Sequence, residues 1–352
     1  MCGSLALTIG DDLTLPLTLQ PLRPDQIARW DSLIAEFPRR TVYHSKAWFQ
    51  CLVETQNVEW RYWAVTDHGR VVGYFTGGIT RRGPFRILGS PLRTWRTNHI
   101  GPLLEEGVDP EAFVQALNDL ARAERLSMVE IEYPGMPHAA YEAAGFACHQ
   151  TWTNTLPLSP NLERMLRNTG AGRRHGIRRA QRYGLEVVDC DGAGTIVHDQ
   201  LTRTLLRKGA LCPFPVEFSQ AVERNLKPAG LLYSLGVRSP QGEIVAVGLF
   251  PRDHHTVYLW ECSSELKGRN HKPNDLLHWG LICRAAVSGL QLYNMSGYGR
   301  FNYAFGTNLE AVHRWNKCYS LSARAARRVY EGMLKLKRRR TPLSGLMDPM
   351  LK

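Results

Sequence analysis

The feature that most constrains the fold is an order of strand, turn and strand that occurs twice. Residues 59–79, "EWRYWAVTDHGRVVGYFTGGI", carry strand-forming residues on both sides of an Asp-His-Gly turn. Residues 232–250, "LYSLGVRSPQGEIVAVGLF", repeat the pattern around Pro-Gln-Gly. Both segments predict a β-hairpin, so the sequence favours two units of similar construction.

Each predicted hairpin is followed by a helical stretch that runs into another strand. These stretches are "LARAERLSMVEIEY" at 120–133 and "LICRAAVSGLQLYNM" at 281–295. Two α/β units joined near residues 155–190 explain this order most simply, and the alternative is chance similarity of two short hairpins. We therefore expect a first lobe at 1–158, a junction at 159–190, a second lobe at 191–325 and a basic tail at 326–352.

Length and composition agree with this division. A chain of 352 residues with 43% hydrophobic residues is long enough for two domains with cores. It has no apolar run of about 18 residues and no basic segment before its first apolar residues, so neither a membrane span nor a cleaved signal is expected. The eight cysteines form no C-x-x-C pair, which favours reduced thiols and a cytoplasmic location, with no metal site.

The junction contains the most unusual stretch of the chain, "NTGAGRRHGIRRAQRYGLEV" at 168–187. Five arginines lie between residues 173 and 182, and no Asp or Glu occurs between Glu163 and Glu186. The pattern predicts one helix that ends near Gly170 and a second that ends at Gly184, followed by a strand. Arg174, Arg178 and Arg182 share one face of the second helix, with Arg179 beside them.

Arginine guanidinium groups suit recognition of phosphate groups, and intrahelical ion pairs cannot neutralise this face. The net charge of +12 likewise favours a polyanionic partner such as RNA, coenzyme A or an anionic membrane. The alternatives are a solvated basic face and a basic protein without a polyanion partner.

An ordered set of segments resembles the FemAB-like branch of the GCN5-related N-acetyltransferase (GNAT) superfamily, also described as BioF2-like. The set covers nearly the whole chain and comprises "TVYHSKAWFQCL" (41–52), "ILGSPLRTWRTNHIGPLL" (87–104), "HAAYEAAGFACHQTWTNTLPLS" (138–159), "GRRHGIRRAQRYGLEV" (172–187) and "NDLLHWGLICRAAVSGLQLYNMSGYGRFNYAFG" (274–306). The fourth segment matches the signature R-x-x-I-R-x-A-x-x-x-G and is the most specific of the five.

The resemblance implies an α/β (α+β) fold of two tandem GNAT-like lobes, each a mixed, mostly antiparallel sheet flanked by helices. It also implies an N-acyltransferase that moves an acyl or aminoacyl group from acyl-CoA or aminoacyl-tRNA to an amine, without a resident cofactor. The acceptor would be an amine-bearing small molecule or a cell-wall precursor, and tRNA is a candidate partner. The residues expected to bind donor phosphates are Arg174, Arg178, Arg179, Arg182, Arg269 and Lys272, and those expected to line a substrate pocket are Trp48, Phe301 and Asn302.

Two positions depart from the family pattern. The turn "LKGRNHKPNDLL" at 266–277 has one glycine where enzymes that bind acyl-CoA carry a glycine-rich turn, and Pro273 has no N–H to offer a pyrophosphate. Asn302 follows Phe301 where related enzymes often carry a lysine, and Arg314 or Lys317 would have to replace that cation. The donor stays open between acyl-CoA and aminoacyl-tRNA.

Acyl transfer to an amine needs a base and a proton donor for the leaving group. Glu261 is the candidate base, because an apolar strand would raise its pKa, although an outward-facing Glu is the alternative. Tyr298, between two glycines in "SGYGRF", is the candidate donor, and a packed loop tyrosine is the alternative. Asp275 and His278, three residues apart, are expected either to form a polar pair or simply to cap the helix and occupy its first turn.

The C-terminal stretch "ARAARRVYEGMLKLKRRRTPL" at 323–343 is strongly basic. Its two leucines, Leu334 and Leu336, are too few to predict a membrane-binding face, so a solvated tail is expected. A protein of another class would carry the same charges: a catalytically silent, RNA-binding protein on a GNAT scaffold. A basic structural protein is a third possibility.

Overall fold

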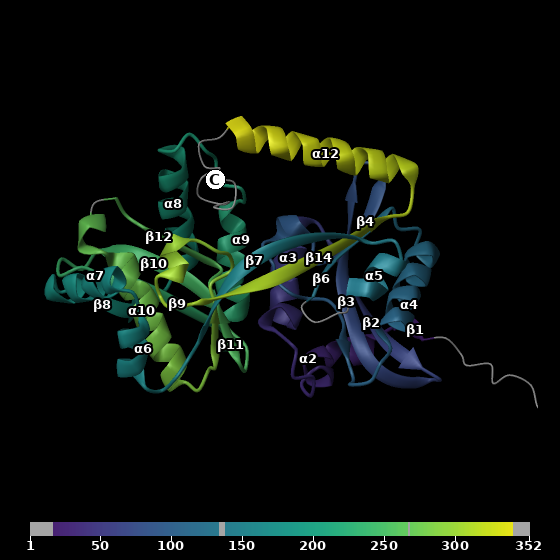
Figure 1. Ribbon diagram of the computed structural model, residues 1–352, viewed down its shortest axis with the longest axis horizontal. Helices are drawn as coiled ribbons and strands as arrows, with labels where there is room; N and C mark the ends of the chain where they lie inside the picture. The colour runs from purple at the N-terminus through teal and green to yellow at the C-terminus, as the bar shows by residue number, and fades with distance from the viewer. Residues whose placement is uncertain (1–16, 134–137, 267, 341–352) are drawn as a thin grey trace, which may run out of the picture.

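The computed structural model describes residues 17–133, 138–266 and 268–340. Two lobes lie side by side along the long axis of the molecule (Figure 1). The strands of the first lobe are β1 (Thr18–Pro21), β2 (Glu59–Asp67), β3 (Arg70–Arg82), β4 (Phe85–Ser90), β5 (Leu103–Leu104), β6 (Met128–Glu132) and β7 (Ala147–Pro157). Its helices are α1 (Pro24–Ala28), α2 (Trp30–Leu33), η1 (Val42–His44), α3 (Lys46–Gln56), η2 (Arg93–Trp95), α4 (Pro110–Ala123) and α5 (His138–Ala143).

The junction consists of two helices, α6 (Leu162–Asn168) and α7 (Ala171–Arg182). The strands that follow are β8 (Glu186–Asp189), β9 (Leu232–Arg238), β10 (Ile244–Pro251), β11 (Thr256–Tyr258), β12 (Glu261–Ser264), β13 (Leu292–Asn294) and β14 (Asn308–Cys318). The helices are α8 (Ala193–Leu206), α9 (Val216–Leu226), η3 (Arg269–His271), α10 (Pro273–Val287), α11 (Arg300–Tyr303) and α12 (Leu321–Arg340).

Both predicted hairpins are present. The first joins β2 to β3 through His68 and Gly69, which have φ values of 47° and 79°. The second joins β9 to β10, with Gly242 at φ 85°. Positive φ at these positions is what a tight hairpin turn requires, so the turn residues mark the hairpins correctly. The predicted helix and strand after each hairpin also form, as α4 with β6 and α10 with β13.

The described strands form two sheets that do not follow the two halves of the sequence. One sheet has the order β1-β2-β3-β4-β6-β14-β7-β13-β11, with β5 paired to β3, and the other has the order β12-β10-β9-β8. β14 comes late in the chain, yet it lies antiparallel between β6 and β7. The larger sheet therefore contains three strands, β11, β13 and β14, that the sequence assigns to the second lobe.

The lobes are joined by a buried aromatic cluster. Trp48 of α3 is fully buried and packs against Trp260 and Phe218, with ring centroids 6.2 and 6.4 Å apart. Tyr43 packs edge-to-face on Tyr258, with centroids 5.0 Å apart. Aromatic rings bury large apolar areas, so this cluster holds the two lobes in one relative orientation.

The basic C-terminal stretch is not a solvated tail over the residues that the structure describes. Residues 321–340 form the long helix α12, which runs across the outside of the molecule from the first lobe toward the second (Figure 1). Ala323 is buried, and Arg327 reaches Glu130 on β6 at 3.2 Å. These two contacts hold the first turns of α12 against the sheet. The composition of the stretch does not predict them. Residues 341–352 lie outside the described residues.

Candidate functional site

The consecutive strands β12 and β13 of the second lobe belong to different sheets, and a gap opens where they diverge. β11 pairs in parallel with β13, whereas β12 pairs antiparallel with β10 in the other sheet. The chain changes sheet at Leu259 and Trp260, between β11 and β12. Residues at the start of β12 and after β13 therefore border the gap, and they include Glu261 and Tyr298.

The inner part of the gap is filled by His278 of α10. Its Nδ1 lies 2.8 Å from the hydroxyl of Tyr293 on β13, and its Nε2 lies 3.7 Å from the thiol of Cys262 on β12. The rings of Phe301 and Phe305 pack on it, with centroids 5.1 and 5.6 Å away. Burial lowers the pKa of His278 to about 3, so the imidazole is neutral and joins the two diverging strands.

Asp275 does not pair with His278. Its carboxylate accepts a hydrogen bond of 2.6 Å from Arg173 of α7 and is almost fully buried. The Arg173 guanidinium also lies over the ring of Phe301, 4.0 Å from the centroid. A Cβ on Gly176 of α7 would come within 1.9 Å of Asp275 Oδ2, so this glycine allows the two helices to approach closely. The start of α10, where a helix attracts anions, thus holds the carboxylate of Asp275.

The turn before α10 uses its own backbone groups. The N–H groups of Arg269, His271 and Lys272 donate to the carbonyls of Leu266, Gly268 and Arg269 at 3.3, 2.9 and 3.0 Å. The guanidinium of Arg269 donates to Thr204, and Lys272 is exposed at the start of α10. These three N–H groups are engaged, and a pyrophosphate would have to displace their carbonyl partners.

The arginines of α7 fall into two groups. Arg174 donates to the backbone carbonyls of Arg167 and Thr169 and so caps the end of α6. Arg178 and Arg182, with His175 and Gln181, border a shallow hollow of about 620 Å³. Arg178, Arg179 and Arg182 are exposed, and no ion pair with an acidic group in the described part of the chain involves them. This outer face of α7 can meet a phosphate-bearing ligand.

Glu261 is buried at the lobe junction, so it is not an outward-facing strand residue. Arg96, which follows η2 in the first lobe, donates to its carboxylate at 2.5 Å. The same guanidinium lies over the ring of Phe214, 4.5 Å from the centroid. Burial raises the pKa of Glu261, as the sequence predicts, and Arg96 opposes that rise. The first lobe thus supplies the counter-charge for the candidate base of the second.

Tyr298 lies in the loop between β13 and α11 and is partly buried. Asn302 donates to the carbonyls of Met295 and Gly297 at 3.4 and 3.3 Å and so helps to hold this loop in place. Asn98 of the first lobe donates to Ser296 at 3.0 Å. The segment around residues 96–98 therefore reaches both sides of the gap, Glu261 through Arg96 and the Tyr298 loop through Asn98.

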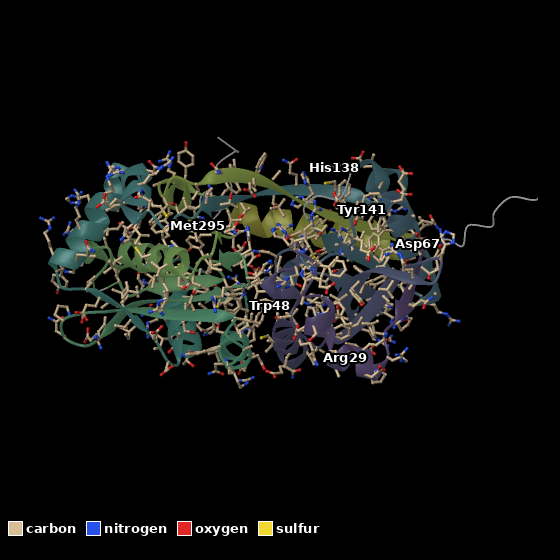
Figure 2. All side chains as sticks on the ribbon, turned by 90° about the horizontal axis from the view of Figure 1, so that it is seen from below. Arg29, Trp48, Asp67, His138, Tyr141 and Met295 are labelled. Carbon is tan, nitrogen blue, oxygen red and sulfur yellow. The ribbon has the colours of Figure 1, made fainter. Side chains whose placement is uncertain are left out.

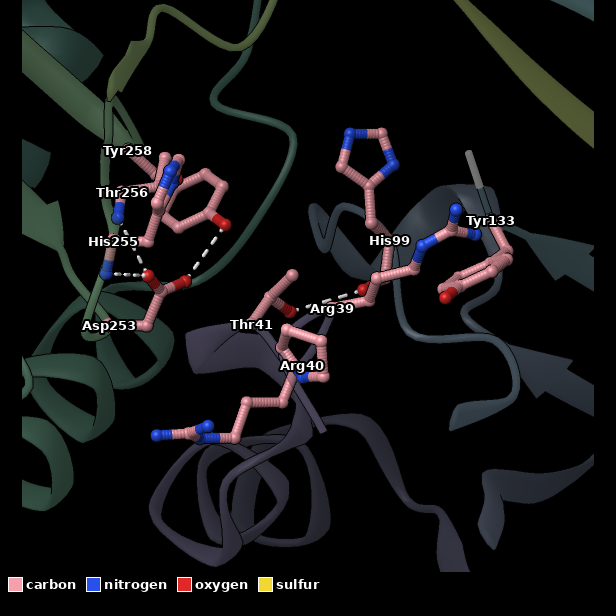
Figure 3. Close-up of a pocket in the computed structure, with 10 residues that line it drawn as sticks. Arg39, Arg40, Thr41, His99, Tyr133, Asp253, His255, Thr256 and Tyr258 are labelled. Atoms are coloured by element: carbon pink, nitrogen blue, oxygen red, sulfur yellow. Dashed lines mark hydrogen bonds between the residues drawn. The ribbon is translucent and has the colours of Figure 1, made fainter. Parts of the chain in front are cut away.

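A cleft of about 420 Å³ lies beside this segment, between the lobes (Figure 3). Asp253 stands on its second-lobe side, where it accepts hydrogen bonds from the hydroxyl of Tyr258 at 2.9 Å and the N–H of Val42 at 3.1 Å. The opposite side carries polar and basic side chains of the first lobe. The cleft is lined by Pro38, Arg39, Arg40, Thr41, His99, Tyr133, Asp253, His255, Thr256 and Tyr258.

A buried ion network supports the floor of the cleft. Glu132 lies between Arg314 of β14 and His99, whose Nδ1 is 3.3 Å away. Although burial would raise it, these two neighbours hold the pKa of Glu132 down at about 2. Arg314 is thus engaged in the first lobe, and Lys317 donates to Asn118 and to the carbonyl of Ala144. Neither Arg314 nor Lys317 therefore replaces the lysine that related enzymes often carry at the position of Asn302.

The structure brings together Phe301, Asn302 and Tyr298 on one side of the gap and places Glu261 on the other. Trp48 does not join them, because it is buried in the middle of the molecule between the lobes (Figure 2). The sequence interpretation missed Arg96, Asp253 and the basic pair at 39–40. The segment "RTWRTNHIGP" pointed to Arg96, since a charged residue lies there among aromatic and glycine positions.

The described residues contain no cluster of three or more His, Cys, Asp or Glu side chains that could hold a metal ion. None of the described helices combines the length and the apolar character that crossing a bilayer needs.

Comparison with known proteins finds a matching domain model for part of the chain and similar folds for most of it. Residues 171–304 match the model of an acetyltransferase (GNAT) domain. No curated protein sequence matches the chain. Among solved structures, FemX is similar with a TM-score of 0.67 and 14% identity, over 84% of this chain and 96% of that one.

Two further structures share the fold. A tandem GNAT protein from the clavulanic acid biosynthesis pathway aligns with a TM-score of 0.53 and 15% identity, over 86% of this chain and 99% of that one. The C-terminal domain of a putative lysylphosphatidylglycerol synthetase from Agrobacterium fabrum aligns with a TM-score of 0.55 and 11% identity, over 86% of this chain and 94% of that one. Residues 171–304 therefore match a GNAT acetyltransferase domain, and the chain shares its two-lobed fold with FemX and the tandem GNAT protein, as the predicted resemblance implies.

Proposed function

We propose that the protein is an N-acyltransferase that forms an amide bond at the gap between β12 and β13. The nitrogen of an acceptor amine attacks the carbonyl carbon of the donor, the new C–N bond forms, and the ester C–O bond breaks. Glu261 takes the proton that the amine loses, and Tyr298 gives a proton to the leaving oxygen. The observation that carries this proposal is the position of both residues at the gap, inside the GNAT domain.

The surroundings of Glu261 support its role as the base. A carboxylate whose pKa is raised by burial is a stronger base than an exposed one. Arg96 opposes the rise in the pKa of Glu261 that burial causes, and its ion pair holds the carboxylate in one orientation. Because Arg96 belongs to the first lobe, the base is in position only when both lobes are packed together.

We assign an aminoacyl-tRNA as the donor. The first turn of α10 already carries the buried carboxylate of Asp275, which is bound by Arg173, and three N–H groups of the preceding turn are engaged. Both features oppose the binding of a coenzyme A pyrophosphate. The exposed arginines of α7, which include Arg178 and Arg182, supply instead an extended surface for a nucleic-acid backbone.

The acceptor is an amine-bearing small molecule or a cell-wall precursor held in the inter-lobe cleft. Asp253 and the basic residues Arg39 and Arg40 line that cleft, so it offers opposite charges to a polar ligand. The reaction is expected in the cytoplasm, where aminoacyl-tRNA is found.

A second candidate function is RNA binding without catalysis. The filled inner part of the gap favours it, because His278 and the two phenylalanines leave the GNAT domain well packed there. This candidate needs the arginines of α7 but has no use for the ion pair between Arg96 and Glu261.

Binding measurements distinguish these possibilities. We expect the protein to bind aminoacyl-tRNA, with weak or undetectable binding of acetyl-CoA in calorimetry. Arg178→Ala with Arg182→Ala should weaken tRNA binding and lower its salt dependence, because two phosphate contacts are lost. Arg82→Ala, at the exposed end of β3, is the matched control.

Each outcome has a clear meaning. Tight binding of acetyl-CoA would replace the proposed donor. Binding of tRNA without any transfer to amines, equal in wild-type protein and Glu261→Gln, would favour the non-catalytic candidate. Binding of neither donor would refute both functions.

A further inference from the structure

The helix α12 carries an apolar stripe that no part of the described structure covers. Leu321, Val329 and Met333 are 79%, 63% and 53% exposed. Their spacing of eight and four residues places them on one side of the helix, within about 120° of one another. Ala325, also exposed, lies within the same stripe. Scattered exposed apolar residues are common, but a stripe at helical spacing is typical of an interaction surface.

The opposite side of α12 is the side that faces the protein. Ala323 is buried, and Arg327 contacts Glu130 and the sulfur of Met128. On a helical wheel these two residues lie roughly opposite the exposed stripe. The contacts of α12 with its own protein thus leave the stripe facing away from the sheet, as the position of the helix on the outside of the molecule indicates (Figure 1).

Positive charge accompanies the stripe. Arg324 and Arg328 are exposed and lie along one of its edges. Residues 321–340 contain eight basic residues and one acidic residue, Glu331. Glu331 pairs with Arg327 at 2.8 Å, so it does not neutralise the outer face.

This combination identifies the class of partner. We propose that α12 binds the protein to an anionic membrane surface, with the helix axis parallel to the bilayer. The stripe enters the boundary between headgroups and acyl chains, and the arginines contact the lipid phosphates. From Leu321 to Met333 the stripe is about 18 Å long, enough for several lipid headgroups. A nucleic-acid backbone would engage the arginines but would offer little to the apolar stripe.

The stripe is not built on the two leucines that the sequence analysis considered. Leu334 and Leu336 alone do not form an apolar face, whereas the exposed stripe starts at Leu321 and depends on Val329 and Met333. The proposal does not depend on the acyl donor. It places the active lobes beside a membrane surface without requiring a helix that crosses it.

Vesicle sedimentation tests the proposal with the full chain. We expect binding to phosphatidylcholine vesicles that contain phosphatidylglycerol, and little binding to phosphatidylcholine alone. Val329→Ser with Met333→Ser should weaken the binding at least about tenfold. Arg324→Gln with Arg328→Gln should weaken it about tenfold to thirtyfold at low salt and less at high salt. Leu211→Ser is the matched control, because Leu211 is exposed, at 82%, outside α12.

The variants change exposed side chains, so their thermal unfolding should match that of the wild type and exclude misfolding as the cause. Equal binding to both kinds of vesicle, or binding that the α12 variants do not change, would overturn the proposal. Loss of binding to polyuridylate in these variants with vesicle binding intact would assign α12 to nucleic acid instead. A change from dimer to monomer in sedimentation, with no vesicle binding, would assign the stripe to a second copy of the chain.

Discussion

Replacing Gly176 with alanine is expected to destabilise the fold, whereas the same replacement at Gly172, one turn earlier in α7, is expected to stabilise it. A Cβ at position 172 meets no atom within 4 Å, while a Cβ at position 176 would lie 1.9 Å from Asp275 Oδ2 and 2.9 Å from its Cγ. Asp275 cannot move away freely, because it is buried and bound to Arg173. The two glycines thus have opposite environments on the same helix.

The magnitudes follow from these environments. Gly172→Ala gains about 0.5–1 kcal/mol from the lower backbone entropy of the unfolded chain. Gly176→Ala gains the same amount but overpacks a tight contact, which costs about 1–3 kcal/mol. It also displaces a buried carboxylate from its arginine, and breaking such a pair fully costs about 3–5 kcal/mol. Because Arg173 retains 24% side-chain exposure, we expect part of that cost and a net loss of about 2–4 kcal/mol.

Urea unfolding followed by circular dichroism measures both changes. The wild type, Gly172→Ala and Gly176→Ala should unfold at midpoints that rank with position 172 highest and position 176 lowest. A Gly176→Ala protein as stable as the wild type would refute the close packing of α7 on α10, and with it the argument that Asp275 occupies the start of α10.

Three further predictions concern buried groups. Arg96→Met should lower the free energy of unfolding by about 2–3 kcal/mol at neutral pH, because Glu261 loses its counter-charge. Burial raises the pKa of Glu261 in the folded state above its ordinary value of 4.5, so this loss of stability should appear as pH rises through the folded pKa and vanish in acid. A loss that urea titrations find to be independent of pH would contradict the ion pair. Burial lowers the pKa of His278 in the folded state from the ordinary histidine value of 6.5 to about 3, so the free energy of unfolding should fall as pH drops from 6.5 toward 3. The stability of His278→Phe should depend less steeply on pH over that range, and an unchanged slope would show that another group takes up the proton. Exposed Cys148 should react with iodoacetamide well before Cys51, because burial raises the pKa of Cys51 to about 12, and mass spectrometry that finds Cys51 labelled first would contradict its burial.

Local chemistry in the sequence predicts much of the fold. The hairpin turns at Gly69 and Gly242 and the helix end at Gly184 need positive φ, and the structure has values of 79°, 85° and 80° there. The apolar positions Ile177 and Ala180 predict the buried side of α7, and both are buried. These features depend on neighbouring residues, so they can be read from short segments.

Features that depend on distant parts of the chain could not be predicted in this way. The insertion of β14 between β6 and β7 joins residues more than 150 positions apart, and no local pattern specifies it. The same is true of Arg96 and Glu261, which belong to different lobes. The sequence identifies Glu261 as a candidate because it lies in an apolar strand, but the arginine that pairs with it becomes evident only from the fold.

The transfer reaction itself is the most direct test of the proposed function. Under single-turnover conditions, tRNA charged with a labelled amino acid is mixed with the protein and a set of amine acceptors, and the label that moves from the ester to an amide is measured. We predict enzyme-dependent amide formation that falls at least about a hundredfold in Glu261→Gln while tRNA binding is retained. Equal rates in Glu261→Gln and wild type would contradict the assigned base, and transfer from acetyl-CoA but not from charged tRNA would contradict the assigned donor.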